Sequence, residues 1–262
     1  MRYYVVSDVH GFFDKMIIAL KDAGYFKDKA PHKLIICGDL FDRGSQTQKM
    51  VDFLLNLIKK DEVILIRGNH EDLMVDLAYN IENYIGVIDY SHHSSNGTFK
   101  TALALSKMNR HDIEKKPMEF KNKMKKSPFF TEILPHMVDY FETEHYVFVH
   151  GWVPCNELKA TSYGGQIAYS KMGNWRGAAP YAWSRARWVN GMAAARCGVL
   201  DDQGKTIVCG HYRTAWGHSV IHGIGQSYGE FGEYSPYYDE GIIAIDGCTA
   251  FTKQVNCIVL DD

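Results

Sequence analysis

The first 75 or so residues repeat one arrangement three times: an apolar run, a short polar motif and then an amphipathic helix. The apolar runs are residues 3–6, 34–37 and 63–66, and after each of them apolar residues recur at helical spacing. Such alternation is typical of right-handed crossovers between parallel strands. The sequence therefore predicts an α/β fold whose polar motifs gather along one edge of a parallel sheet, where open α/β sheets bind ligands.

The second polar motif, GDLFDRG at residues 38–44, is the richest in charge. Asp39 is placed to hold a hard or borderline cation, and Arg43 to hold an anion beside it. Taken alone, the motif is equally consistent with an aspartate that caps the next helix and a surface arginine. Ligand binding is favoured because the same design recurs along the chain.

Composition narrows the class of protein. Of 262 residues, 46% are hydrophobic and 23% are charged, which indicates a globular chain with a substantial core. The net charge of −2 provides no basic field for a nucleic-acid backbone, so we expect no nucleic-acid partner. Because no internal duplication, low-complexity tract or linker is visible, we expect a single domain over residues 1–262.

Cysteine usage and hydropathy indicate in which cellular compartment the protein is expected. The six cysteines are scattered and form no C-x-x-C pair, a pattern that favours reduced thiols over disulfides or a zinc knuckle. No basic and apolar leader is visible, and no apolar run approaches the roughly 20 residues that span a bilayer. We therefore expect a cytoplasmic protein without a membrane partner.

Beyond the third repeat the pattern changes. Residues 80–139, approximately, read as a polar, Lys-rich helical insertion over one side of the sheet, and its lysines favour a solvated face over a substrate-docking patch. Residues 146–149 and 207–209 read as further strands. The apolar runs at 242–245 and 255–260 look like a pair of strands.

Six polar residues follow apolar runs, and each lies beside or near a glycine: Asp8, His10, Asp39, Asn69, His150 and His211. This mixed nitrogen and oxygen set suits Mn, Fe or Zn better than calcium. One metal cannot use six such ligands comfortably, whereas two can if a carboxylate bridges them at about 3.5–4 Å. Each histidine alone is more often structural, but the glycines allow tight turns that direct all of them into one cleft.

Five motifs, in order, resemble those of the calcineurin-like metallophosphoesterases: DVHG, GDLFDRG, GNHE, HG at His150 and GH at His211. The resemblance covers nearly the whole chain and is closest to the phosphoprotein phosphatase family. The IDG segment that contains Asp246 resembles the bacterial and phage-type members. The resemblance implies a central β-sandwich of mixed sheets flanked by helices, with the active site at the carboxyl ends of the strands.

The resemblance also implies a cofactor of two divalent ions, with Mn our first expectation and Fe or Zn open. A hydroxide held between the ions would be the nucleophile. One ion would take Asp8, His10 and Asp39, and the other would take Asp39, Asn69, His150 and His211, so that Asp39 bridges them.

Four further residues acquire catalytic roles by the same resemblance. His70 would be the general acid that protonates the leaving alkoxide, oriented by Asp42; the competing interpretation pairs Asp42 with Arg43 alone. Arg43 would clamp the phosphoryl oxygens. The WSR segment makes Arg185 the second arginine of the site, with Arg187 as its main rival.

The sequence departs from the family pattern at the walls of the expected cleft. Trp152 follows the HG motif where a second glycine is common, and Tyr212 and Arg213 follow the GH motif in place of Thr and Pro. Residues 216–238 form a segment unusually rich in glycine and aromatic residues. These changes leave the expected ligands in place, but they alter the surroundings of a substrate.

The leading functional prediction is a two-metal phosphomonoesterase acting on phosphorylated proteins, at phosphoserine or phosphothreonine, or on small phosphate esters. The alternative is a symmetrical dinucleoside tetraphosphate hydrolase, in which aromatic side chains of the insertion or of residues 216–238 would stack on adenine. A nuclease is disfavoured by the near-neutral charge. A metal-free binding scaffold would require eroded ligands, and all six are present.

Overall fold

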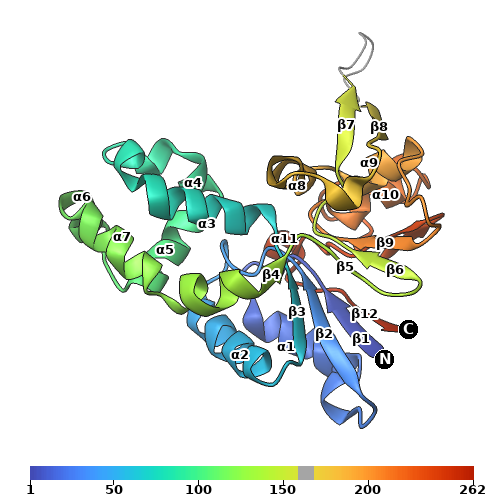
Figure 1. Ribbon diagram of the computed structural model, residues 1–262, viewed down its shortest axis with the longest axis horizontal. Coiled ribbons are helices and arrows are strands. Elements are labelled where there is room, and N and C mark those ends of the chain that lie inside the picture. Colours follow the sequence, from blue (N-terminus) through green and yellow to red (C-terminus); the bar gives the residue numbers. More distant parts are fainter. Residues whose placement is uncertain (159–167) are drawn as a thin grey trace.

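The computed structural model describes residues 1–158 and 168–262. Two five-stranded sheets pack face to face, and helices cover the outer side of each (Figure 1). The two chain ends lie next to each other, where the amino group of Met1 donates to a carbonyl of Asp262. The mixed sandwich expected from the family resemblance is confirmed.

The first sheet has the order β12-β1-β2-β3-β4, in which the first four strands of the chain are parallel and β12 is antiparallel to β1. Side chains alternate between two cores: Val6 and Ile36 face the outer helices, whereas Val5 and Ile35 face the second sheet. Burial on both faces explains why these strands read as continuous apolar runs. The strands are β1 (Arg2–Val6), β2 (His32–Cys37), β3 (Val63–Ile66), β4 (Met137–Val138) and β12 (Cys257–Asp261).

The second sheet has the order β10-β11-β9-β6-β5. Its residues Phe148, Val208 and Ile243 pack against the first sheet and close the core between the two. On the other face Trp152 and Trp183 lie in a separate core under the carboxyl-terminal helices. The strands are β5 (Phe141–Glu142), β6 (Tyr146–Phe148), β9 (Thr206–Cys209), β10 (Tyr237–Asp239) and β11 (Ile242–Ala244); β7 (Cys155–Leu158) and β8 (Ala168–Lys171) form a separate hairpin.

The predicted pairing of the last two apolar runs is wrong. β11 pairs with β9 and β10 in the second sheet, whereas β12 pairs with β1 in the first. The chain crosses from one sheet to the other between them, through α11 (Thr249–Thr252). Both runs are apolar because both border the core between the sheets, and this shared burial says nothing about which neighbour each strand takes.

The three predicted helices of the repeat are present on the outer side of the first sheet. The region expected as an insertion is helical, and its helices α5 and α7 contact α3 (Figure 1). Phe120 and Met124 of that region join the core beneath the first helices. The helices are α1 (Phe13–Asp22), α2 (Thr47–Lys59), α3 (Asn69–Asn80), α4 (His92–Ser95), α5 (Thr98–Ser106), α6 (Arg110–Lys115) and α7 (Pro117–Lys125).

Three helices pack with the second sheet: α8 (Pro180–Ala186), α9 (Gly191–Arg196) and α10 (Thr214–Val220). In the part of the chain that the structure describes, no helix is long and apolar enough to span a bilayer. All six cysteines are free, as their scattered positions indicated. Short 3-10 or π turns occupy η1 (Tyr25–Lys27), η2 (Ile81–Tyr84), η3 (Ile88–Tyr90), η4 (Phe129–Ile133), η5 (Leu134–His136) and η6 (Trp175–Gly177).

Candidate metal centre and active site

The carboxyl ends of strands from both sheets bring the six predicted ligands together. Asp8 and His10 follow β1, Asp39 follows β2 and Asn69 opens α3 directly after β3. His150 and His211 come from the second sheet, after β6 and β9. All except His211 are no more than 3% exposed.

Asp39 lies between two groups of these side chains. Its Oδ2 is 3.6 Å from Nε2 of His10, which in turn is 3.9 Å from Oδ1 of Asp8. Its Oδ1 is 3.3 Å from Nε2 of His150, which is also 2.7 Å from Oδ1 of Asn69. Nitrogen atoms of His150 and His211 and one Asp39 oxygen lie within 4.8 Å of one another. The position of Asp39 is therefore that of a carboxylate able to bridge two cations.

The hydrogen bonds of the histidines test whether a metal fits. Nδ1 of His150 is 2.7 Å from the carbonyl of Cys37, which can only accept, so Nδ1 carries the proton and Nε2 presents a lone pair. That lone pair faces the oxygens of Asn69 and Asp39. His10 repeats the arrangement, with Nδ1 3.2 Å from the carbonyl of Phe41. Lone pairs that converge on one space repel each other unless a cation lies among them, so the residues fit divalent metal ions.

The pKa shifts of the buried groups also fit a metal centre. Burial, with nearby cationic side chains, lowers the pKa of His10 and of His211 well below the usual histidine value, and neutral imidazole is the form that binds metals. Burial, with the neighbouring Asp8 and Glu71, raises the pKa of Asp39 well above its usual value, although His70 acts in the opposite direction. Added positive charge would therefore favour the ionised form of Asp39.

Backbone strain is concentrated at the site. Asp8, His10, Asp39 and His211 have φ between 48° and 64°, the left-handed region that residues other than glycine rarely adopt. Such conformations persist where the surrounding structure fixes them, and they cluster at functional sites. Two glycines allow the close approach: a Cβ on Gly68 would lie 2.3 Å from Oδ1 of Asp39, and one on Gly210 would lie 1.8 Å from the hydroxyl of Ser7. These two glycines therefore permit neighbouring motifs to pack closely.

His70 and Asp42 form a buried pair beside the ligands. Nδ1 of His70 is 2.7 Å from Oδ2 of Asp42, and its Nε2 is 3.3 Å from Nη2 of Arg43. Among the described residues Asp42 has no ion pair with Arg43, which excludes the competing interpretation. Burial acts to lower the pKa of His70, but Asp39 and Asp42 outweigh it and the pKa is raised. The guanidinium beside Nε2 of His70 makes that nitrogen a poor metal ligand.

Three buried residues near the centre were not predicted as part of it. Glu71 accepts hydrogen bonds from the backbone N–H groups of Asp39, Leu40 and Gly68, and so holds the second motif against the third. The signal was available, because Glu71 completes the GNHE motif in the first turn of α3. Ser7 donates to Asp8, and burial beside Asp8 raises the pKa of Asp246 to about 8.

The two arginines of the WSR region are paired with carboxylates that are not among the predicted ligands. Arg185 is 68% exposed and its Nη2 is 3.5 Å from Oε2 of Glu157. Arg187 is buried and is ion-paired with Asp72 and Asp139. A phosphate-binding role for Arg185 therefore stays a prediction, whereas the contacts of Arg187 are structural.

The sequence profile described as calcineurin-like phosphoesterase matches residues 1–214, most of the chain. The chain belongs to the calcineurin-like phosphoesterase family. Its metal-capable cluster of histidines and aspartates accords with the divalent metals that this family uses.

Two curated relatives are similar in sequence to part of this phosphoesterase. The asymmetrical bis(5'-nucleosyl)-tetraphosphatase PrpE of Anoxybacillus flavithermus is 32% identical over 78 residues, 28% of this chain and 32% of the relative. The symmetrical bis(5'-nucleosyl)-tetraphosphatase of Buchnera aphidicola subsp. Acyrthosiphon pisum is 39% identical over 83 residues, 32% of this chain and 29% of the relative. The match thus spans about a third of these relatives.

A solved cold-active protein tyrosine phosphatase has a similar fold. It superposes with a TM-score of 0.55 at 15% identity, covering 99% of this chain and 73% of that one. At this level of identity the likeness concerns the fold alone.

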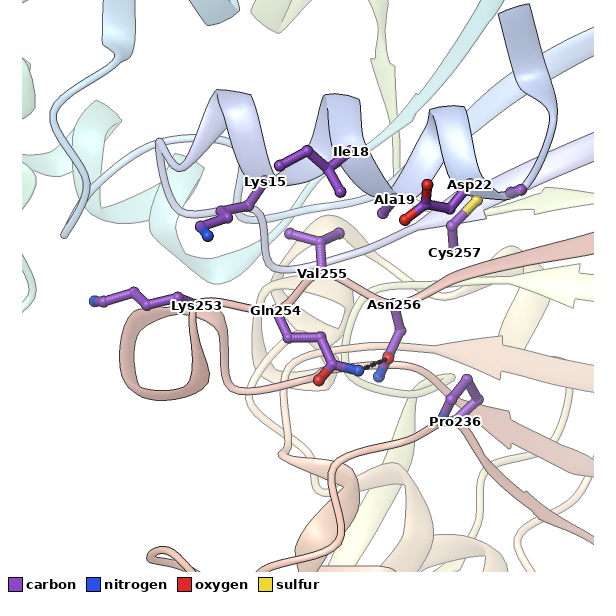
Figure 2. Close-up of a pocket in the computed structure, with 11 residues that line it drawn as sticks. Lys15, Ile18, Ala19, Asp22, Pro236, Lys253, Gln254, Val255, Asn256 and Cys257 are labelled. Carbon is purple, nitrogen blue, oxygen red and sulfur yellow. Dashed lines mark hydrogen bonds between the residues drawn. The ribbon is translucent and has the colours of Figure 1, made fainter. Parts of the chain in front are cut away.

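A separate hollow of the phosphoesterase lies away from the metal centre. It has a volume of about 520 Å³ and lies between α1 and the segment that enters β12 (Figure 2). Lys15 and Ile18 project from α1 above it, while Gln254 and Asn256 project from the opposite segment. None of the predicted ligands lines it.

Proposed function

We propose that this phosphoesterase hydrolyses phosphate bonds directly at a centre of two divalent cations. One cation would be held by Asp8, His10 and Asp39, and the other by Asp39, Asn69, His150 and His211. When bound, the cations supply activation of water and neutralisation of charge on the phosphoryl group. The observation that carries the proposal is the placement of Asp39 between two groups whose lone pairs converge.

Manganese is the proposed metal, because the ligand set combines carboxylate and amide oxygens with imidazole nitrogens. Iron or zinc at one of the two positions is compatible with the same ligands. Elemental analysis of protein purified without chelators identifies the metal and its stoichiometry. Two ions per chain support the proposal, whereas a single ion contradicts it.

The roles of the adjacent residues follow from their contacts. The proposed general acid is His70, because Asp42 orients its ring and helps to keep it protonated. Arg43 can hold phosphoryl oxygens with its planar fork, since its guanidinium lies against the same imidazole. Together these residues would bind the phosphoryl group, orient it and supply the proton of the leaving group.

For the substrate we propose a dinucleoside tetraphosphate, in accord with the names of the matched relatives. Phosphoserine or phosphothreonine in a protein is the second candidate, favoured by the buried pair of His70 and Asp42, because an alkoxide leaving group needs a proton far more than a phosphate leaving group does.

One experiment separates the candidates. The wild-type protein and His70→Asn are assayed with diadenosine tetraphosphate, a phosphoserine peptide and p-nitrophenyl phosphate. For the wild type, the higher kcat/KM identifies the natural substrate class. His70→Asn should lower turnover of the phosphopeptide by about 10²-fold or more and affect p-nitrophenyl phosphate much less, since nitrophenolate leaves without a proton. Equal losses on all three substrates would contradict the role of His70 as the acid.

A further inference from the structure

Arg213 is a cation without a counter-ion beside the proposed centre. It lies two residues after His211, and no carboxylate in the described part of the chain lies within ion-pair distance of it. Its Nε donates to the carbonyl of Ser227 at 2.6 Å, which leaves the other donors of the guanidinium available. By contrast, Arg176 and Arg187 are each held by two or more carboxylates.

Arg213 and Arg43 both act on one residue, Cys248. Burial raises the pKa of the Cys248 thiol to about 11, while Arg213 and Arg43 both act to lower it, so both guanidinium groups lie within electrostatic reach of this thiol. Arg43 lies next to His70, where it can bind the phosphoryl group under attack. A nucleoside polyphosphate carries further phosphates, and the remaining donors of the Arg213 guanidinium can bind one of them.

Aromatic rings extend outward from Arg213. Its guanidinium lies over the ring of Tyr212, 5.3 Å from the centroid, and over that of Tyr228, at 5.1 Å. Tyr228 is 52% exposed and its ring centroid is 5.1 Å from that of Phe251, which is 42% exposed. Large exposed aromatic faces next to a cation are the elements with which proteins stack nucleobases and track their phosphates.

We propose that Arg213, Tyr228 and Phe251 form a subsite for a nucleoside polyphosphate, in which Arg213 binds phosphates beyond the one under attack and the two rings stack on the base. This inference rests on the proposed function, because it presumes that the reacting phosphoryl group lies at the centre around Asp39. A phosphopeptide would present one phosphate and no flat heterocycle, so it would use this surface poorly.

The test measures inhibition of p-nitrophenyl phosphate hydrolysis by two probes, inorganic tripolyphosphate and ATP. Arg213→Gln should raise the inhibition constants of both probes by about tenfold or more, as expected for the loss of charge-assisted hydrogen bonds to phosphate. Tyr228→Ala should raise the constant for ATP by about fivefold or more and change that for tripolyphosphate much less, because only ATP has a base to stack. Arg213→Lys should restore part of the tripolyphosphate affinity, since it keeps the charge and loses the fork.

Matched controls lie elsewhere on the surface. Arg196→Gln removes an arginine of α9 that also has no carboxylate partner among the described residues, and Tyr90→Ala removes a tyrosine that is 93% exposed. Neither control should change inhibition by more than about twofold. Thermal melting of each variant verifies that it is folded.

The outcomes separate this subsite from the proposed function. Absence of p-nitrophenyl phosphate turnover by metal-loaded wild-type protein would overturn the proposed function itself. Normal turnover, with Arg213→Gln and Tyr228→Ala indistinguishable from the controls, would overturn the subsite alone. An equal effect of Tyr228→Ala on ATP and tripolyphosphate would also overturn it, as would a selective loss of affinity for a phosphoserine peptide.

Discussion

The buried ligands of the candidate metal centre, here called the floor, and the exposed residues near them in the chain, here called the rim, are built in opposite ways. On the floor, Asp8, His10 and Asp39 are at most 3% exposed and have left-handed backbone conformations fixed by surrounding hydrogen bonds. On the rim, Trp188 is 50% exposed and the side chain of Arg185 is 68% exposed. The floor is therefore fixed in one geometry, whereas the rim can change its side chains at little cost to the fold. In the proposed function the floor would carry the chemistry and the rim would decide the substrate.

The largest effect should come from the floor residue that both cations share. Asp39→Asn preserves the shape of the side chain but removes the charge that a bridging ligand supplies. We expect loss of bound metal and a fall in kcat/KM of about 10³-fold or more for p-nitrophenyl phosphate, on the scale of removing a group that stabilises a transition state electrostatically. Elemental analysis and kinetics check both. Near-normal turnover with two bound ions would show that Asp39 is not the bridge.

A smaller effect, confined to the protonation of His70, should come from Asp42→Asn. Burial lowers the pKa of His70, while Asp39 and Asp42 raise it, so removing the Asp42 charge should lower that pKa. A general acid works only when protonated, and a raised pKa extends its activity to higher pH. The variant should therefore lose activity on a phosphoserine peptide at a lower pH than the wild type does.

The pH profile of kcat measures this shift, with p-nitrophenyl phosphate as the control substrate because its leaving group needs no acid. An alkaline limb that stays in place in Asp42→Asn would argue that Asp42 merely holds the loop, for example through Thr98, whose hydroxyl donates to the same carboxylate.

The floor could be predicted from sequence because its signals are local. Asp8 and Asp39 each follow an apolar run and lie beside or near a glycine, and parallel strands of one sheet bring such positions to one edge. His150 shows the same local signal, although its strand β6 belongs to the second sheet. The GNHE motif marks Glu71 as part of the site, but its contacts with the backbone of Asp39 and Leu40 join residues about thirty positions apart, and the motif does not identify these partners.

The strand pairing and the arginine contacts could not be predicted in the same way, because they depend on residues far apart in the sequence. β11 and β12 have the same apolar character, and their assignment to different sheets is decided by the partners β9 and β1, far away in the chain. Similarly, the sequence favoured Arg185 and left Arg187 as its rival, since a counter-ion such as Asp72 is brought to Arg187 only by folding.

The smallest expected effect on activity concerns Arg185, an exposed residue of the rim. Arg185 is exposed beside Glu157, and a long exposed side chain must surrender rotamer freedom before it can hold a phosphate. We therefore expect Arg185→Ala to raise KM for p-nitrophenyl phosphate by about threefold to tenfold while the melting temperature is unchanged. Arg187→Ala is the contrast: it leaves Asp139 without this partner and Asp72 with Arg67 alone, and should lower stability by about 1–3 kcal/mol, seen in thermal or urea unfolding. If instead Arg187→Ala raised KM in a fully stable protein, Arg187 would be the second phosphate-binding arginine, and it would belong with the residues of the floor.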